Sequence, residues 1–428
     1  MTKLNKNQIY VIVVLLLGTF LFYTWKASVS YPLFSPGNAY SSYYDLLGDA
    51  FLKGQLYLPI NVPKGLLDLE NPYDPVANKK YREMGLADIS MYKGKFYLYF
   101  GTIPVIVLYL PVYLITKLRI SDSFAITLFM FGSVIWGTLL LLHLRSKYFQ
   151  IIPIWIVYIS ILVLGFANMA PYLISEATLW SIPISCGVFF LVGAVYFLCT
   201  AIHSDGLYFK RLTLASLSLG LAVASRPNFF VASIILIMFL LIKLLYKHYK
   251  IFSKTLLLSL IVPFVICILC MGFYNYARFE DVTEFGIKYQ LTLQDNSKKG
   301  STILVEPKAD RVGNFLNYYL LSPPLRDHTF PYIHKNLYLT RPHSSLGWAP
   351  LKEDIVGLIP SCPFVLMLFL APLFYWFYSN KSKLKFDNIS FFKFEIGILI
   401  AIAVTNFICL QVWSIEAVSY LPAINLFL

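Results

Sequence analysis

The sequence contains few charged residues. Only 13% of its 428 residues carry charge, whereas about 25% is usual in a soluble protein. Hydrophobic residues make up 58% of the chain, and apolar runs of about 18 residues or more recur along it. These runs are continuous and do not alternate with polar residues, which excludes a transmembrane β-barrel. The composition therefore predicts an all-α polytopic membrane protein.

Signals for metals, nucleic acids and disulfides are also missing. The chain has no zinc-ligand spacing, and its basic residues do not alternate with aromatic residues as in a nucleic-acid interface, so no cofactor, metal or nucleic acid is predicted. The 6 cysteines fall in or near apolar runs, which is typical of small buried side chains and not of a disulfide framework. No A-x-A-like cleavage site follows the first apolar run, so it is interpreted as an uncleaved span.

The apolar runs are separated by basic clusters. The runs lie at about 8–25, 97–116, 123–144, 149–170, 177–201, 209–225, 229–246, 255–276, 355–378, 394–413 and from 415 onward. The basic clusters lie at 3–6, 145–147, 210–211, 243–254 and 381–393, and they account for much of the net charge of +13. Cytoplasmic loops are enriched in Lys and Arg, so all these clusters are expected in the cytoplasm with the N-terminus. That arrangement requires one of the runs between 97 and 144 not to cross the membrane.

The run 97–116 is the better candidate to remain on the outer surface. Gly101, Pro104 and Pro111 interrupt a helix, and its four tyrosines suit a membrane interface. This interpretation places Lys117 and Arg119 outside, against the charge rule. It predicts a helical bundle of about ten transmembrane helices as a single domain over 1–428, with two large outer loops, 27–122 and 277–354. The cytoplasmic connectors are too short for a nucleotide-binding domain, so any chemistry is expected on the outer face.

The first outer loop begins with two acids, Asp45 and Asp49, in the segment "YYDLLGDAFLKGQLYL". Their spacing of four places both on one face of a helix. Further along, Asp74 lies in the turn-like "NPYDP", and Asp88 precedes a predicted pair of strands with a turn at "KGK".

Other charged residues lie at the predicted outer ends of spans. Glu176 begins the span 177–201 and either binds substrate or complements the helix N-terminus, with Ser175 as the cap. Arg226 either extends toward the interface or holds a phosphate, which guanidinium groups bind well. Arg278 and Lys288 follow the span 255–276 in a tyrosine-rich segment.

Taken in order, these segments resemble the GT-C superfamily of membrane glycosyltransferases. More closely, the chain is similar to a bacterial group of uncharacterised GT-C-like proteins that resemble the dolichyl-phosphate-mannose-protein mannosyltransferases. The matching patterns are Asp49–Leu58, Asn71–Pro75, Tyr97–Pro104, Glu176, Ser225–Pro227 and Tyr274–Leu291. Two features depart from the group: Thr102 replaces the usual proline, and Tyr420 has no adjacent arginine or following acid.

The resemblance implies an inverting glycosyltransferase of the bacterial cell membrane, multi-pass with a cytoplasmic N-terminus. Its donor would be a polyprenyl-phosphate sugar and its acceptor a glycan, lipid or protein. Asp45 or Asp49 would accept the acceptor's proton. Binding of substrate is expected from Asp74, Asp88, Glu176, Arg226, Arg278 and Lys288. Two alternatives remain: a transporter or flippase of lipid-linked sugars, and a non-catalytic membrane assembly protein.

Overall fold

The computed structural model describes 4–30, 32–37, 42–150, 152–168, 170–202, 208–247, 254–292, 295–297 and short segments between 321 and 361. The chain divides into two compact units, the first comprising 1–166, 170–233 and 249–302. The predicted spans 394–413 and from 415 onward lie outside the described residues, as do most of the predicted span 355–378 and most of the predicted loop 277–354.

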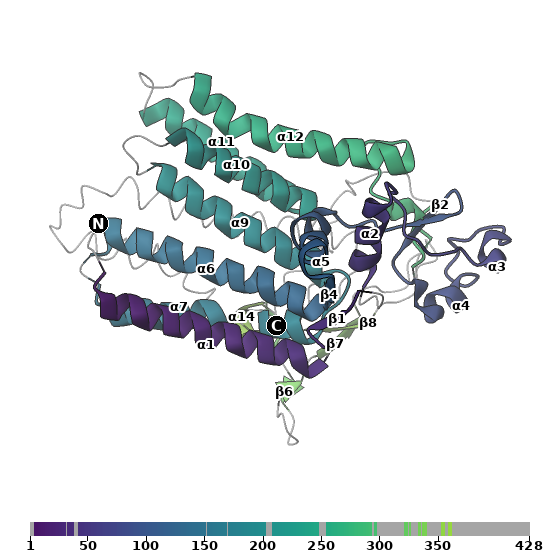
Figure 1. Ribbon diagram of the computed structural model, residues 1–428, viewed down its shortest axis with the longest axis horizontal. Coiled ribbons are helices and arrows are strands. Elements are labelled where there is room, and N and C mark those ends of the chain that lie inside the picture. Colours follow the sequence, from purple (N-terminus) through teal and green to yellow (C-terminus); the bar gives the residue numbers. More distant parts are fainter. Residues whose placement is uncertain are drawn as a thin grey trace. The chain divides into compact units, whose positions relative to one another are not determined.

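The first unit is dominated by long helices (Figure 1). These are α1 (Lys6–Ser30), α6 (Asp122–Tyr148), α7 (Ile154–Phe166), α8 (Ala170–Ser175), α9 (Ser181–Ile202), α10 (Tyr208–Ser225), the start of α11 (Phe229–Lys247) and α12 (Lys254–Phe279). Within this unit α9 packs between α6 and α10, and α10 packs against α12. Of the second unit, the structure describes most of α11, α14 (Leu358–Ser361) and two strand pairs, β5 (Leu325–Arg326) with β6 (Ile333–His334) and β7 (Asn336–Leu339) with β8 (Lys352–Ile355).

Five of the described helical segments are long and apolar enough to cross a membrane. They are Lys6–Val29, Asp122–Lys147, Ile154–Ser175, Ser181–Ala201 and Lys254–Phe279. On α12, the large apolar side chains of Leu269 and Phe273 are 66% and 72% exposed, as expected where lipid is the solvent. The prediction of a mostly helical, multi-pass membrane protein is thus confirmed in its coarse form, while the prediction of about ten spans stays a prediction.

The basic clusters of the described spans share one end of the helices. The start of α1, the end of α6 and the start of α7 meet in one apolar cluster that includes Leu4, Leu141 and Ile154. At the same end, Arg145 donates to the Ile152 carbonyl (3.2 Å) and Arg211 donates to the Thr200 carbonyl (2.7 Å). We call this the basic end. If the basic clusters all face the cytoplasm, spans that alternate in direction must bring them to the same end of the bundle, as observed.

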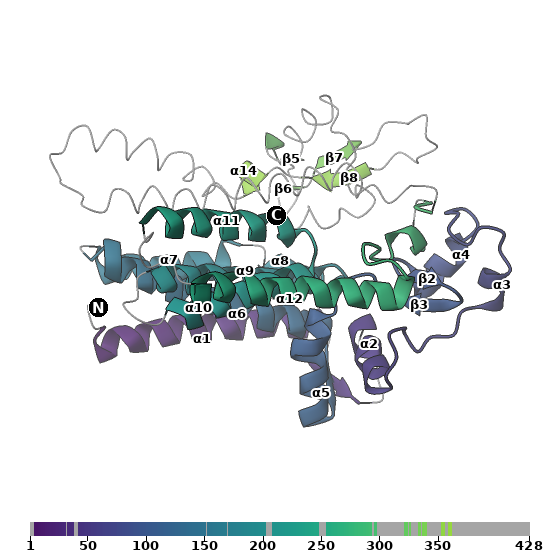
Figure 2. The ribbon, with the colours of Figure 1, turned by 90° about the horizontal axis from the view of Figure 1, so that it is seen from above.

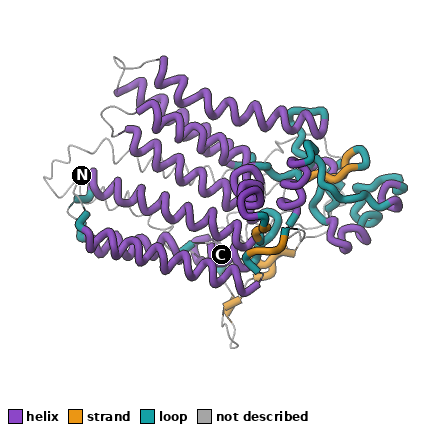
Figure 3. The backbone as a smooth tube through the Cα atoms, viewed as in Figure 1, coloured by secondary structure: helices purple, strands orange, loops and turns teal. Residues whose placement is uncertain are grey.

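The first loop, residues 31–121, lies at the opposite end, which we call the loop end (Figure 3). Strand β1 (Phe34–Pro36) leaves α1 and pairs antiparallel with β4 (Leu118–Ile120), which leads directly into α6. The first loop therefore begins and ends at one two-stranded sheet. Between these strands lie α2 (Tyr43–Leu52), α3 (Lys64–Leu67), α4 (Lys79–Tyr81), η1 (Arg82–Leu86), β2 (Ser90–Tyr92), β3 (Lys95–Tyr97), η2 (Val105–Tyr109) and α5 (Leu110–Thr116).

The run 97–116 does not form a spanning helix. Its helical part is 103–116, which includes η2 with 5 residues and α5 with 7 residues, a rise of about 21 Å at most. The hydrocarbon core of a bilayer is about 30 Å thick. In addition, α5 lies across the direction of the long helices (Figure 2). Both observations fit the predicted interfacial element.

Residues 280–292, which follow α12, pair with the first loop. The backbone of Asp88 donates to the Leu291 carbonyl (2.9 Å), and Leu291 donates in return to Ile89 (3.0 Å). Ser90 and Gln290 form an isolated bridge, and the Ser90 hydroxyl donates to the Gly286 carbonyl (2.8 Å). The predicted strand pair with its turn at "KGK" is confirmed as β2 and β3. Segments from two distant parts of the sequence thus form one platform at the loop end.

The role predicted for Ser175 as a helix N-cap is wrong. Ser175 is the last residue of α8, and its hydroxyl donates back to the Pro171 carbonyl (2.8 Å). Glu176 follows the end of α8, and α9 begins only at Ser181. The Glu176 carboxylate therefore does not lie at the start of a helix. The apolar run 177–201 does not reveal that α9 begins only at Ser181.

We expect the two ends of the bundle to face opposite sides of the membrane. Single cysteines at Lys80→Cys and Lys210→Cys, both exposed positions, would be tested after replacement of the native cysteines. An impermeant maleimide is expected to label position 80 in intact spheroplasts and position 210 only after permeabilisation. Labelling of position 210 before permeabilisation would contradict the predicted orientation.

Gly101 is required by close packing between the first loop and α10. A Cβ at this position would overlap the backbone carbonyl oxygens of Ala224 and Ser225. We expect Gly101→Ala to reduce stability by about 1–3 kcal/mol, seen as a lower melting temperature in detergent. Gly18→Ala is the control, since nothing lies within 4 Å of that Cβ; a helical Gly→Ala change stabilises by up to about 1 kcal/mol. Equal melting temperatures for the two variants would contradict the close approach.

Candidate functional site

Helix α2 carries the two predicted catalytic aspartates. The Ser42 hydroxyl caps the helix by accepting from the backbone of Tyr44 (3.1 Å) and Asp45 (3.4 Å), and the negative charge of Asp45 suits the first turn. Gly54, with φ of +67°, follows the C-cap and ends the helix. The expected helix is confirmed, and Asp45 and Asp49 lie one turn apart on it.

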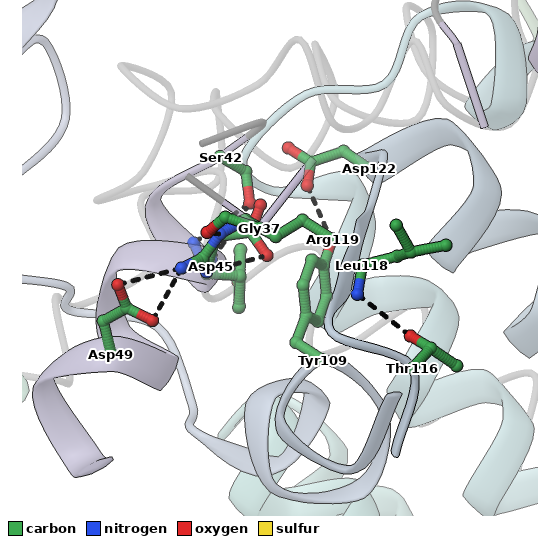
Figure 4. Close-up of polar contacts among 10 residues, drawn as sticks. Gly37, Ser42, Asp45, Asp49, Tyr109, Thr116, Leu118, Arg119 and Asp122 are labelled. Atoms are coloured by element: carbon green, nitrogen blue, oxygen red, sulfur yellow. Dashed lines mark hydrogen bonds and ion pairs between the residues drawn. The ribbon is translucent and has the colours of Figure 1, made fainter. Parts of the chain in front are cut away.

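Both aspartates face one arginine, Arg119 of β4 (Figure 4). Its Nη2 donates to Oδ1 and Oδ2 of Asp49 at 2.8 and 2.9 Å. Its Nη1 lies 3.8 Å from Oδ1 of Asp45. The Nε of Arg119 donates to the Gly37 carbonyl (2.8 Å), and its guanidinium lies 4.6 Å from the centre of the Tyr113 ring. One side chain thereby joins β4, α2, α5 and the chain after β1.

This ion cluster is buried. The side chains of Arg119 and Asp45 are each 3% exposed, and that of Asp49 is 13% exposed. Charges removed from water need partners of opposite sign, and loss of one partner leaves the others uncompensated. Asp49 is held through both oxygens, whereas Asp45 makes a longer ion pair with the same guanidinium. The two aspartates thus differ in how Arg119 contacts them.

Asp122, the first residue of α6, joins the same cluster. Its Oδ1 accepts a hydrogen bond from the Tyr109 hydroxyl (2.6 Å), and its carboxylate also contacts Ser42. The Tyr109 ring stacks on Tyr44 of α2, with ring centres 5.6 Å apart. The cluster therefore includes a third carboxylate, and it holds η2 between α2 and the start of α6.

Arg226 lies near Tyr44, just after α10. The residue is 8% exposed. Burial lowers the pKa of its guanidinium from the ordinary value, and the nearby hydroxyls of Tyr99 and Tyr44 oppose this shift. An arginine stays charged under such a shift. A buried cation beside two tyrosines fits the predicted phosphate-binding role, which stays a prediction.

Asp88 lies where the first loop meets residues 280–292. Its backbone adopts a left-handed conformation, with φ of +59°, and its side chain is half-buried. Burial raises the pKa of its carboxyl from the ordinary value to about 7, and the positive charge of Arg82 opposes this. Within the described part of the chain, no hydrogen bond or ion pair engages this carboxylate.

Asp74 and Glu176 have simpler surroundings. Oδ1 of Asp74 accepts from the backbone of Val76 (2.7 Å) and Ala77 (3.3 Å), which is an Asx turn and confirms the predicted turn at "NPYDP". Glu176 is exposed. Neither side chain contacts the Arg119 cluster.

Arg278 and Lys288 are engaged in contacts of the loop end. Arg278 is 4% exposed and donates to the Leu98 carbonyl (2.6 Å) and to Asn275 (2.7 Å), with its guanidinium 3.9 Å from the Tyr274 ring centre. It thus fastens the first loop to α12. Lys288 lies on η3 (Ile287–Tyr289), 3.7 Å from Oε2 of Glu284.

Sequence reasoning missed the roles of Arg119, Tyr109 and Asp122. From the sequence alone, Arg119 is only a cation on the unexpected side of the membrane. That anomaly was itself the signal, because an arginine beside apolar segments requires a carboxylate partner. Asp122 follows Ser121, whose hydroxyl caps α6 by accepting from Phe124 (3.3 Å), and this pattern alone indicates a helix start and nothing more.

Comparison with known proteins adds no assignment: no family model, curated protein or solved structure matches the chain. Among the residues that the structure describes, no group of three or more His, Cys, Asp or Glu side chains is arranged to hold a metal ion.

Replacement of Arg119 is expected to destabilise the loop end. Arg119→Ala leaves the buried carboxylates of Asp45 and Asp49 without their shared cation, which we expect to cost about 3–5 kcal/mol of unfolding free energy. The measurement is thermal unfolding in detergent. Lys53→Ala removes an exposed cation from the end of α2 and should change stability by less than about 0.5 kcal/mol. An Arg119→Ala protein as stable as the Lys53→Ala control would contradict this role.

Proposed function

We propose that the chain is a glycosyltransferase of the bacterial cell membrane, with its N-terminus in the cytoplasm and its loop end on the outer face. It moves a sugar from a polyprenyl-phosphate donor to a glycan, lipid or protein acceptor. This proposal extends the GT-C resemblance of the sequence to the site described above.

The proposal rests mainly on one observation. A buried cluster of carboxylates, tyrosines and arginine lies at the loop end, fixed to a short helix that runs across the long helices (Figures 2 and 4). The headgroup of a polyprenyl phosphate lies at the membrane surface while its tail remains in the lipid. A site for such a donor therefore needs polar groups at the ends of the spans and an apolar element beside them, and α5 with exposed Leu114 and Ile115 supplies that element.

The reaction requires two kinds of charged group. The acceptor hydroxyl oxygen forms a bond to C1 of the sugar, and the C1–O bond to phosphate breaks with its electron pair on the phosphate oxygen. A positive group stabilises the leaving phosphate, and the buried Arg226, near Tyr44 and Tyr99, is the candidate for it. A carboxylate accepts the hydroxyl proton, and attack opposite the leaving group inverts the configuration at C1.

Asp45 and Asp49 are the carboxylates that the sequence predicts for this proton transfer. Asp49 is held through both oxygens by Arg119, while the Asp45 carboxylate is 3.8 Å from the same group. Both aspartates are candidates for the base, and their single variants distinguish them.

The distribution of charge favours outer-face chemistry over a transporter or flippase. Transport of a charged headgroup uses ionisable residues at mid-membrane depth. In the five described spanning candidates, charged residues lie near the helix ends: Lys6, Lys26, Asp122, Arg145, Lys147, Lys254 and Arg278. In a non-catalytic assembly protein, the clustered side chains at the loop end would have no chemical role. An assay of sugar transfer distinguishes that alternative from an enzyme.

Asp45→Asn and Asp49→Asn, alone and combined, test the function. The reconstituted full-length protein would be given polyprenyl phosphates carrying labelled mannose, glucose or galactose, with a bacterial envelope fraction as acceptor. We expect the double variant to transfer sugar at least about 100-fold more slowly, since general-base catalysis contributes about 10²–10⁴-fold.

Asp68→Asn is the matched control, because Asp68 is an exposed acid of the same loop and should leave transfer unchanged. Melting temperatures of all variants would be compared to separate slow chemistry from unfolding. Full turnover by a folded double variant would rule out a catalytic role for both residues.

A further inference from the structure

The ring of Tyr44 on α2 is fixed by packing. The residue is fully buried. Its ring stacks on that of Tyr109 with 5.6 Å between the ring centres, and the Tyr109 hydroxyl donates to Oδ1 of Asp122 at 2.6 Å. Contacts with η2 and, through it, with the start of α6 therefore hold the Tyr44 ring in one position.

The Tyr44 hydroxyl itself is only weakly engaged. It donates to the Leu179 carbonyl at 3.4 Å, whereas an O–H···O hydrogen bond normally measures about 2.5–3.0 Å. Burial raises the pKa of this hydroxyl well above the ordinary value; the charge of Asp122 adds to the shift, and that of Arg226 opposes it. The hydroxyl therefore stays protonated at neutral pH, and it is a buried hydrogen-bond donor without a good acceptor.

Two neighbours in the sequence also carry buried polar groups without partners. The indole N–H of Trp180, the residue after Leu179, has no hydrogen-bond partner among the described residues. The same is true of the hydroxyl of Ser123, the residue after Asp122, which is fully buried. A buried donor costs free energy unless it finds an acceptor. A phosphate group offers several charged acceptor oxygens, so it is a ligand that suits such donors.

Arg226 lies near the Tyr44 hydroxyl. The hydroxyl of Ser225, the preceding residue, donates to Sγ of Cys186 (3.2 Å), a residue of α9 that also lies near Tyr44. The charges of Arg226 and of the Tyr44 hydroxyl act on each other. A buried cation and a buried O–H donor therefore occupy one place, where α2, α9 and the end of α10 meet.

From this geometry we infer that Tyr44 and Arg226 bind the same phosphate group of the polyprenyl-phosphate donor, Tyr44 as a hydrogen-bond donor and Arg226 as the cation. This inference rests on the proposed function and deepens it, because it adds a second phosphate-binding residue. As the C1–O bond breaks, its electron pair stays on the leaving phosphate oxygen. The Tyr44 hydroxyl stabilises that growing charge and keeps its own proton. The proton of the acceptor hydroxyl still passes to Asp45 or Asp49.

The first turn of α2 then serves both sides of the reaction. Tyr44 and Asp45 are consecutive, so their side chains leave the helix about 100° apart. Asp45 faces Arg119, while the Tyr44 hydroxyl lies near Arg226. One short helix thus positions a group that binds the leaving phosphate and a candidate for the base.

Tyr44→Phe tests this role, because it removes only the hydroxyl and keeps the stacked ring. The reconstituted full-length protein would be given mannosyl, glucosyl and galactosyl polyprenyl phosphates as probes. We expect kcat to fall about 10²-fold, the order of effect seen when one donor to a developing oxyanion is lost. KM should change less, since the hydrogen bond is strongest in the transition state. A wild-type kcat in the folded variant would overturn the inference.

Tyr23→Phe is the matched control. Tyr23 of α1 is also fully buried, and its hydroxyl donates to the Gly165 carbonyl of α7. Its loss should leave kcat unchanged. Melting temperatures of both variants would be compared with the wild type to separate slow chemistry from unfolding. An equal loss of kcat in the two folded variants would show a general effect of losing a buried hydroxyl and would overturn the inference.

Phosphate binding is measured separately from sugar transfer. Polyprenyl monophosphate should raise the melting temperature of the wild type and of Tyr23→Phe, and raise that of Tyr44→Phe less. Equal stabilisation of all three proteins would contradict a contact between Tyr44 and the phosphate. Inorganic phosphate at the same concentration is the second arm. If it stabilises the wild type as well as the lipid does, the site is one for free phosphate and the assignment to the lipid donor is wrong.

A labelled tyrosine covers the case in which Tyr44→Phe does not fold. Fluorotyrosine incorporated at position 44 of the full chain keeps both the ring and the hydroxyl. Its fluorine resonance should shift when polyprenyl phosphate is added and stay in place when the polyprenol without phosphate is added. The same response to both lipids, or no response to either, overturns the inference.

The two proposals fail in different ways. A wild-type protein that transfers sugar from none of the probes contradicts the proposed function, and the catalytic role of Tyr44 with it. A wild-type protein that transfers sugar while Tyr44→Phe does so equally well contradicts the role of Tyr44 alone.

Discussion

The loop end depends on one buried interaction, the pairing of Arg119 with the carboxylates of Asp45 and Asp49. A guanidinium removed from water beside membrane spans must be neutralised, and a helix with two acids one turn apart provides the partner. Because Arg119 lies on the strand that leads into α6, the pairing fixes α2 relative to the bundle. Its contacts with Gly37 and Tyr113 extend this constraint to the end of β1 and to α5.

A second constraint joins the first loop to the chain that follows α12. Arg278 binds the Leu98 carbonyl, and the strand-like contacts of Ile89 and Asp88 with Leu291 continue the connection. Backbone groups at this end thus satisfy one another across about 200 residues of sequence. The proposed transfer chemistry requires such rigidity, since donor phosphate, acceptor hydroxyl and base must be held together while the lipid tail stays in the bilayer.

Several features were predictable because they depend on local sequence or on charge along the chain. Pro104 and Pro111 with Gly101 indicated that 97–116 is not a continuous span, and the structure contains only short helices there. The turn at Asp74 and the strand pair around "KGK" follow from local turn chemistry. The start of α9 at Ser181 was not predictable, because the apolar run 177–201 begins four residues before it.

The sequence by itself determined that this is a multi-pass helical membrane protein, that its basic connectors share one end, and that acids follow the first span. Those properties follow from hydropathy and charge, which sum along the chain. Only the tertiary structure decided which acids are neutralised and which are not. Arg119 is 70 residues from Asp49, and Asp88 meets Leu291 through folding alone, so no local pattern records that two aspartates share a cation while Asp88 has none of its own.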